Sequence, residues 1–81
     1  MHEMKYIIFN NCGLPIAVIF SDQISHSEMA SKFDYLKPKS AGMISVTSTG
    51  EVLTYGRSTT LNLVWQLGDD EIIERMLGRN D

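Results

Sequence analysis

One cysteine and one histidine are the residues of this chain best suited to nucleophilic or acid–base chemistry. Cys12 precedes Gly13 in a predicted turn, and a nucleophilic cysteine needs a neighbouring base or a positive field to lower its pKa. The sequence places no such group beside it. His26 is flanked by two serines at the expected start of a helix, where the helix dipole disfavours a protonated imidazole. We therefore interpret Cys12 as a small turn residue and His26 as structural, and a small hydrolase is the least favoured function.

Residues that could bind a metal are equally sparse. His2, Cys12 and His26 are far apart in the sequence, and they show none of the usual ligand spacings of metal sites. We expect no metal ion, no cofactor and no catalytic residue, and hence a protein that is not an enzyme.

The segment Gly56–Thr60 is the best candidate for binding an anion. Arg57 can pair with a phosphate or a carboxylate, and the hydroxyls of Ser58, Thr59 and Thr60 follow it directly. The segment is not a Walker loop, because it lacks the Gly-Lys-Ser/Thr sequence and because a strand follows in place of a helix. Two interpretations stay open. One is a small-anion or nucleotide-binding module, and the other is a β-turn that leads into a threonine-rich strand.

The elements that would position these residues begin with a hairpin. The runs Met4–Asn10 and Leu14–Phe20 are rich in β-branched and aromatic residues and flank an Asn/Gly turn, which predicts two antiparallel strands. Both faces of the second run are apolar, so we expect that strand to be central in the sheet or covered on both sides. Pro15 has no N–H to donate and is expected at the entry of the strand or at a bulge.

A short helix is predicted over residues 26–35. Ser25 and Glu28 fit the N-cap and N3 positions of a capping box, and Ile24 and Met29 fit the hydrophobic staple that accompanies it. A proline shortly afterwards prevents the helix from continuing.

The second half of the chain returns to a period of two. Met43–Thr47 and Val52–Tyr55 flank a Ser-Thr-Gly sequence, which indicates a second hairpin, and Leu61–Trp65 alternates like a fifth strand. Acidic residues from Asp69 onward indicate the start of a second helix, for which Gly78 is the expected C′ residue.

The predicted order of elements is ββαββ(β)α, in one small domain that spans residues 1–81. A chain of 81 residues has room for one core. We expect an α+β fold that forms a two-layer sandwich, with both helices on one face of an antiparallel four- to five-stranded sheet. The alternative is a half-open barrel that curls around the first helix.

Charge and apolar runs limit the partners of this chain. The net charge is −3, and it comes entirely from residues 41–81, since positive and negative side chains balance over residues 1–40. The only local cluster of cations, Lys32, Lys37 and Lys39, is small, so nucleic-acid binding is disfavoured. No apolar run approaches the roughly 20 residues of a membrane span, and the N-terminal run is too short for a signal peptide. Because a lone cysteine fits a reducing compartment, we expect a cytoplasmic protein.

The last predicted strand suggests an interface. A helix of about ten residues is only ~15 Å long, whereas five strands span about 20 Å across a sheet, so two short helices leave apolar sheet uncovered. We expect the uncovered part at Leu63, Val64 and Trp65. A domain of this size is close to the limit of independent stability, which favours a homodimer. The function we expect is therefore non-enzymatic and based on protein–protein interaction.

Four short motifs occur in order along the chain: Tyr6-Ile7-Ile8-Phe9, Ile24-Ser25-His26-Ser27-Glu28, Lys39-Ser40-Ala41-Gly42 and Gly56-x-Ser58-x-x-Leu61. In this order they resemble a group of short uncharacterised proteins encoded by bacteriophages and prophages of Gram-negative bacteria. The resemblance implies no activity and assigns no residue a role. It implies a phage accessory or host-modulating protein, whose partner would be a host or phage protein.

Overall fold

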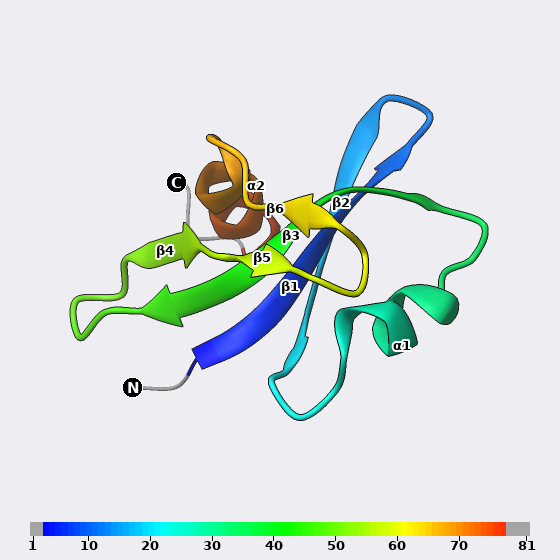
Figure 1. The fold of residues 1–81 in the computed structure, drawn as a ribbon. Helices are drawn as coiled ribbons and strands as arrows, with labels where there is room; N and C mark the ends of the chain where they lie inside the picture. Colours follow the sequence, from blue (N-terminus) through cyan, green and yellow to red (C-terminus); the bar gives the residue numbers. More distant parts are fainter. Residues whose placement is uncertain (1–2, 78–81) are drawn as a thin grey trace.

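The computed structural model describes residues 3–77. The elements follow in the order β1 (Glu3–Asn11), β2 (Leu14–Ser21), α1 (His26–Ser31), β3 (Lys37–Val46), β4 (Val52–Tyr55), β5 (Arg57–Ser58), β6 (Leu63–Val64) and α2 (Asp69–Met76), as Figure 1 shows. The α+β class and the antiparallel sheet are confirmed, and the sheet does not close into a barrel. The order of elements is as predicted except for β5, since a turn and not a strand is expected at Arg57 and Ser58.

An antiparallel four-stranded sheet in the order β2-β1-β3-β4 forms the centre of the molecule. The hairpin predicted between the first two strands is confirmed, and its register pairs Asn11 with Leu14. Cys12 and Gly13 form the turn with positive φ angles of 54° and 86°, which is the backbone of a type I′ turn. The twist of this turn matches that of the strands it joins, so the hairpin can continue through eight residue pairs.

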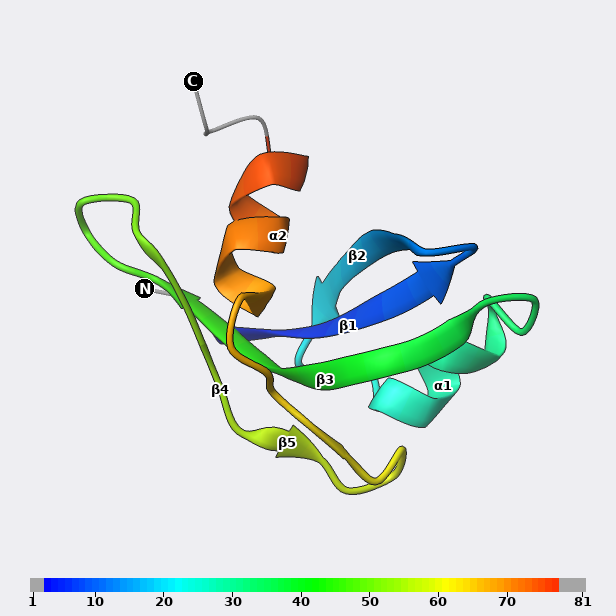
Figure 2. The same cartoon turned by 90° about the horizontal axis from the view of Figure 1, so that it is seen from above.

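The two helices lie on opposite faces of this sheet, so the expected placement of both on one face is wrong (Figure 2). Side chains alternate between the two faces along a strand, and the four consecutive apolar residues of β1 are all fully buried. One set packs with α2 and forms the α2-side core, which contains Tyr6, Ile8, Ala17, Ile44, Val52 and Ile73. The other set packs with α1 and forms the α1-side core, which contains Ile7, Phe9, Phe20, Leu36 and Ala41.

The second strand of the hairpin has apolar residues on both faces for the same reason. Ala17 belongs to the α2-side core and Phe20 to the α1-side core, so the expectation that β2 is covered on both faces is confirmed. In the sheet, however, β2 is an edge strand, and β1 takes the place between two neighbours.

The first helix is shorter than the predicted residues 26–35. The N–H of Glu28 donates to Ser25 Oγ over 3.1 Å, so Ser25 is the N-cap residue as expected. After Ser31 the chain tightens into turns, in which Phe33 N–H donates to the Ala30 carbonyl. Bonds of this i→i−3 type are typical of a helix end that cannot continue.

The third strand begins at Lys37, earlier than the sequence pattern indicates, and it includes Pro38. Pro38 lies opposite Phe9, next to a register shift between Ile8 and Phe9. A bulge of this kind tolerates a residue without an N–H.

The alternating run 61–65 does not extend the main sheet as a fifth strand. β6 pairs with β5 in a separate two-stranded sheet, because Asn62 has a left-handed φ of 56° that interrupts the extended backbone. The second helix begins at Asp69 as predicted, while the expected C′ residue, Gly78, lies outside the described residues.

Candidate interaction surface at the edge of β2

The pattern of hydrogen bonds in the β1–β2 hairpin determines which backbone groups of β2 face its free edge. Asn11 and Leu14 flank a two-residue turn, so they form a hydrogen-bonded pair. Hydrogen-bonded and non-hydrogen-bonded pairs alternate from there. The residues that direct their N–H and C=O groups toward β1 are Leu14, Ile16, Val18 and Phe20. The residues that direct theirs away from the sheet are Pro15, Ala17, Ile19 and Ser21.

Two independent observations agree with this assignment. Pro15 has no N–H, and it occupies an outward position at which β1 requires no donor. The carbonyl of Ser21, also outward, accepts a hydrogen bond of 3.1 Å from the N–H of Ile24. Within residues 3–77, the outward N–H and C=O groups of Ala17 and Ile19 have no hydrogen-bond partner, so they are available to another strand.

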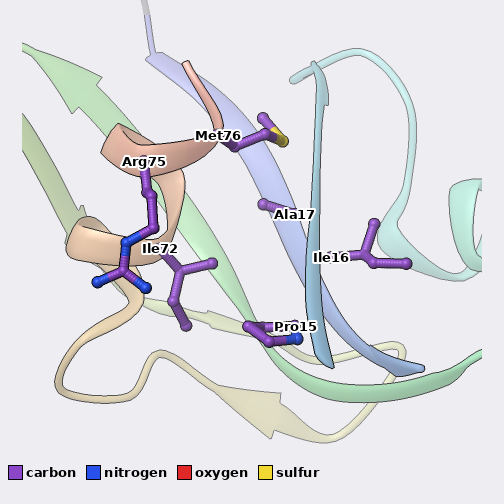
Figure 3. A pocket seen from close by; sticks show the side chains of 6 residues that line it. All are labelled: Pro15, Ile16, Ala17, Ile72, Arg75 and Met76. Carbon is purple, nitrogen blue, oxygen red and sulfur yellow. The ribbon is translucent and has the colours of Figure 1, made fainter. Parts of the chain in front are cut away.

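An apolar cavity of about 310 Å³ lies beside this edge, between β2 and α2 (Figure 3). The residues that line it are Pro15, Ile16 and Ala17 from β2, and Ile72, Arg75 and Met76 from α2. Successive side chains of a strand point to opposite faces. Because three consecutive residues of β2 line the cavity, the cavity reaches around the edge of the strand and is not confined to one face.

The edge of β2 lacks most of the features that keep strand edges from pairing. Natural edge strands are usually short, bulged or charged. The run Leu14–Ser21 is eight residues long, carries no charged side chain and pairs with β1 without a bulge. Only Pro15 interrupts its edge, close to one end. The opposite edge of the sheet is formed by β4, which has only four residues.

Cys12 and His26 do not form a catalytic pair. Cys12 is exposed in the hairpin turn before β2, whereas His26 follows β2 and is 5% exposed. The Nε2–H of His26 donates to the carbonyl of Gly42 over 3.0 Å, and its ring packs edge-on against Phe20. Burial lowers the pKa of His26, and the positive charge of Lys5 contributes in the same direction. His26 thus serves as a neutral buried donor that fixes the start of α1 against β3.

No group of three His, Cys, Asp or Glu side chains in residues 3–77 could hold a metal ion.

The predicted anion segment lies on β5 and in the turn that follows it. Ser58 is buried, and its Oγ accepts a 3.1 Å hydrogen bond from the N–H of Leu61. Thr60 Oγ1 accepts a 3.2 Å bond from the N–H of Ser27. These two hydroxyls therefore fix the turn and join it to the start of α1. Arg57 and Thr59 are exposed, and they are the members of the predicted anion site that have side chains free to meet a ligand.

The predicted interface at the last strand is divided between the core and the surface. Leu63 packs against the α1-side core, whereas Val64 is 52% exposed and Trp65 is 41% exposed.

One buried polar pair was not anticipated from the sequence. Tyr6 O–H donates to Asp69 Oδ2 over 2.6 Å, and the N–H of Gln66 donates to the same oxygen over 3.0 Å. Burial raises the pKa of Tyr6, and the carboxylate of Asp69 raises it further. Asp69 is 1% exposed, so this pair anchors α2 to β1 rather than offering a group to a ligand. In the sequence, Asp69 is already explained as an acidic residue that interacts favourably with the helix dipole. Its hydrogen bond to Tyr6 is therefore not apparent from the sequence.

Comparison of the chain with models of known protein families, with curated proteins and with solved structures gives no match. Residues 3–77 include no helix that is long and apolar enough to span a membrane.

Proposed function

We propose that this protein is a non-enzymatic accessory protein of phage or prophage type, which acts in the cytoplasm by protein–protein interaction. The free edge of β2 is its contact surface, and the partner adds a strand there. The observation that carries this proposal is the uncharged edge of β2 with its unpaired backbone groups at Ala17 and Ile19, beside an apolar cavity.

Strand addition suits this edge for two physical reasons. Main-chain hydrogen bonds to an exposed sheet edge supply affinity, and pockets for alternate side chains supply specificity. The outward N–H and C=O groups of Ala17 and Ile19 provide the main-chain hydrogen bonds. The cavity between β2 and α2 provides a pocket for a side chain of the partner. An enzymatic function has less support, because His26 is buried and already hydrogen-bonded, and Cys12 lies in a turn.

Site-specific photocrosslinking in living Gram-negative bacterial cells tests this function without knowledge of the partner. A photoreactive phenylalanine analogue would replace Leu14, which is 68% exposed at the start of β2. The matched control carries the same analogue at Tyr35, which is 77% exposed in the turn after α1. A third variant carries it at Val64, at the interface predicted from the sequence.

We expect illumination to produce a covalent polypeptide adduct from position 14 and not from position 35. An adduct from position 64 alone would move the contact surface to β6 and contradict the assignment to β2. Equal adducts from positions 14 and 35 would show non-specific collision. The absence of an adduct at all three positions would contradict a function based on protein–protein interaction.

A further inference from the structure

We infer that the strand added to β2 is β2 of a second copy of this chain, paired antiparallel about a two-fold axis that passes through Val18. This inference rests on the proposed function, because it names the polypeptide that the edge of β2 binds. It joins two four-stranded sheets into one continuous sheet of eight strands.

Backbone hydrogen bonding selects this register. Two antiparallel copies of β2 can pair only through residues whose N–H and C=O groups point outward. With the axis at Val18, Ala17 of each copy faces Ile19 of the other, which gives four hydrogen bonds between the copies. Pro15 then faces Ser21 of the second copy. The N–H that Pro15 lacks would have met the Ser21 carbonyl, which already accepts a bond from Ile24 N–H.

The two neighbouring registers each leave an outward backbone group of Ala17 or Ile19 without a suitable hydrogen-bond partner. An axis at Ala17 places Pro15 opposite Ile19 of the second copy, so the Ile19 carbonyl faces a residue with no donor. An axis at Ile19 places Ala17 opposite Ser21, so the Ala17 N–H meets a carbonyl that is already bonded to Ile24. The register centred on Val18 leaves neither Ala17 nor Ile19 without a partner.

Side-chain shapes agree with the same register on the α2 side of the sheet. Ala17 is small, and the cavity opens beside it under Ile72 and Met76. In the register centred on Val18, Ile19 of the second copy lies directly opposite Ala17, on the same face of the sheet. Each chain thus has an apolar hollow beside Ala17 and an apolar side chain at Ile19. Two-fold pairing places Ile19 of each copy against the hollow of the other. Met76 is 47% exposed in the single chain, and this contact would cover it.

Self-complementarity favours a second copy over an unrelated peptide. In the register centred on Val18, Ala17 and Ile19 supply the donors and acceptors of both hydrogen-bonded pairs. The same two residues also supply the position beside the hollow and the side chain that fills it.

A disulfide provides a test of both the partner and the register. Directly opposed residues of a non-hydrogen-bonded antiparallel pair have Cα atoms about 4.5 Å apart, which is close enough for a disulfide. Only Val18 meets itself across the axis. In a Cys12→Ser background, Val18→Cys should therefore link two chains under mild oxidation. Ile16→Cys is the matched control, since Ile16 is similarly half-buried on the same face but lies opposite Phe20 of the second copy.

The unmodified chain is measured by light scattering, and we expect the mass of a dimer.

Two results would overturn the inference. A monomer mass at high micromolar concentration would exclude the second copy, and an adduct at position 14 with a different protein would then leave the proposed function standing. A dimer in which Val18→Cys does not link, or in which Ile16→Cys links equally well, would exclude this register. The absence of any photoadduct from a chain that dimerises through Val18 would instead contradict the cellular function.

Discussion

At the scale of single residues, Gly42 occupies a position where no side chain fits. A Cβ atom built there would lie 2.5 Å from the Tyr55 carbonyl oxygen and 3.3 Å from the Tyr6 ring. Backbone atoms cannot move aside as a flexible side chain can. The chain therefore needs glycine here, because the end of β4 approaches β3 too closely for a side chain.

Gly42→Ala should lower the free energy of unfolding by about 1–3 kcal/mol or more, as overpacked substitutions do. Ser40→Ala on the same strand is the control. Ser40 Oγ is buried and has no hydrogen-bond partner among the described residues, so removal of this hydroxyl should cost little. Urea unfolding of both variants measures the difference. Equal midpoints for Gly42→Ala and Ser40→Ala would contradict the predicted close contact.

His26 should make the stability of the fold depend on pH. Burial lowers its pKa in the folded chain, whereas in the unfolded chain an imidazole binds a proton below about pH 6.5. Between these two pKa values the unfolded chain binds more protons than the folded chain. Stability is therefore complete above about pH 6.5 and decreases as the pH falls below it.

Urea midpoints measured from about pH 7.5 to about pH 5.5 should show this decrease. His26→Gln keeps a donor near the position of Nε2 but does not titrate, so its midpoint should vary less over the same range. A variant with the same pH dependence as the original chain would assign the effect to other groups.

At the scale of elements, the ends of α1 and β3 show what local sequence patterns predict. The start of α1 follows from a single side chain, because Ser25 Oγ accepts the Glu28 N–H in the way that the capping pattern requires. The reciprocal bond from the Glu28 side chain does not occur within the described residues. The helix ends early, and β3 begins early at Lys37. The end of α1 and the start of β3 both depend on contacts with distant residues, which a local sequence pattern does not contain.

Ser25→Ala should lower the free energy of unfolding by about 1 kcal/mol, because it leaves the N–H of Glu28 without its acceptor. Ser27→Ala is the matched control, since within residues 3–77 the only hydrogen bond of Ser27 Oγ is with Ser25 Oγ, over 3.3 Å. Urea unfolding should therefore show a smaller effect for Ser27→Ala. An unchanged midpoint for Ser25→Ala would show that the cap contributes no stability.

At the scale of the whole molecule, the sequence predicts the two-sided burial of the strands but not the layers that cause it. The run Tyr6–Phe9 is apolar at every position, which is the pattern of a strand covered on both faces. Two helices on opposite faces follow naturally from that pattern. The short length of the helices relative to the width of the sheet instead predicts one uncovered region, with an interface at Leu63, Val64 and Trp65. The free edge of β2 cannot be recognised from the sequence, because the order of strands in the sheet depends on contacts between distant residues.

The hydrogen bond between Tyr6 and Asp69 joins the first strand to the last helix. Tyr6→Phe should lower the free energy of unfolding by about 1–3 kcal/mol, because the buried Asp69 carboxylate then keeps only the Gln66 N–H as a donor among the bonds described. Tyr35→Phe is the control, since the Tyr35 side chain is 77% exposed. Urea unfolding compares the two, and equal small losses would show that the Tyr6–Asp69 bond is not needed to hold α2.

The placement of α1 and α2 on opposite faces also gives the molecule an order of assembly during synthesis. The buried residues of the α1-side core lie within the first 41 positions, and Leu61 and Leu63 complete its cover, whereas the α2-side core is completed only by Ile73. A ribosome delivers the chain from its N-terminus, so one face of the sheet can close while Tyr6 and Ile8 are still uncovered on the other. At that stage the apolar α2 side of the sheet is exposed and accessible to chaperones. Limited proteolysis of ribosome-arrested chains that expose residues up to Gln66 should find α1 protected, and cleavage within α1 at that stage would contradict this order.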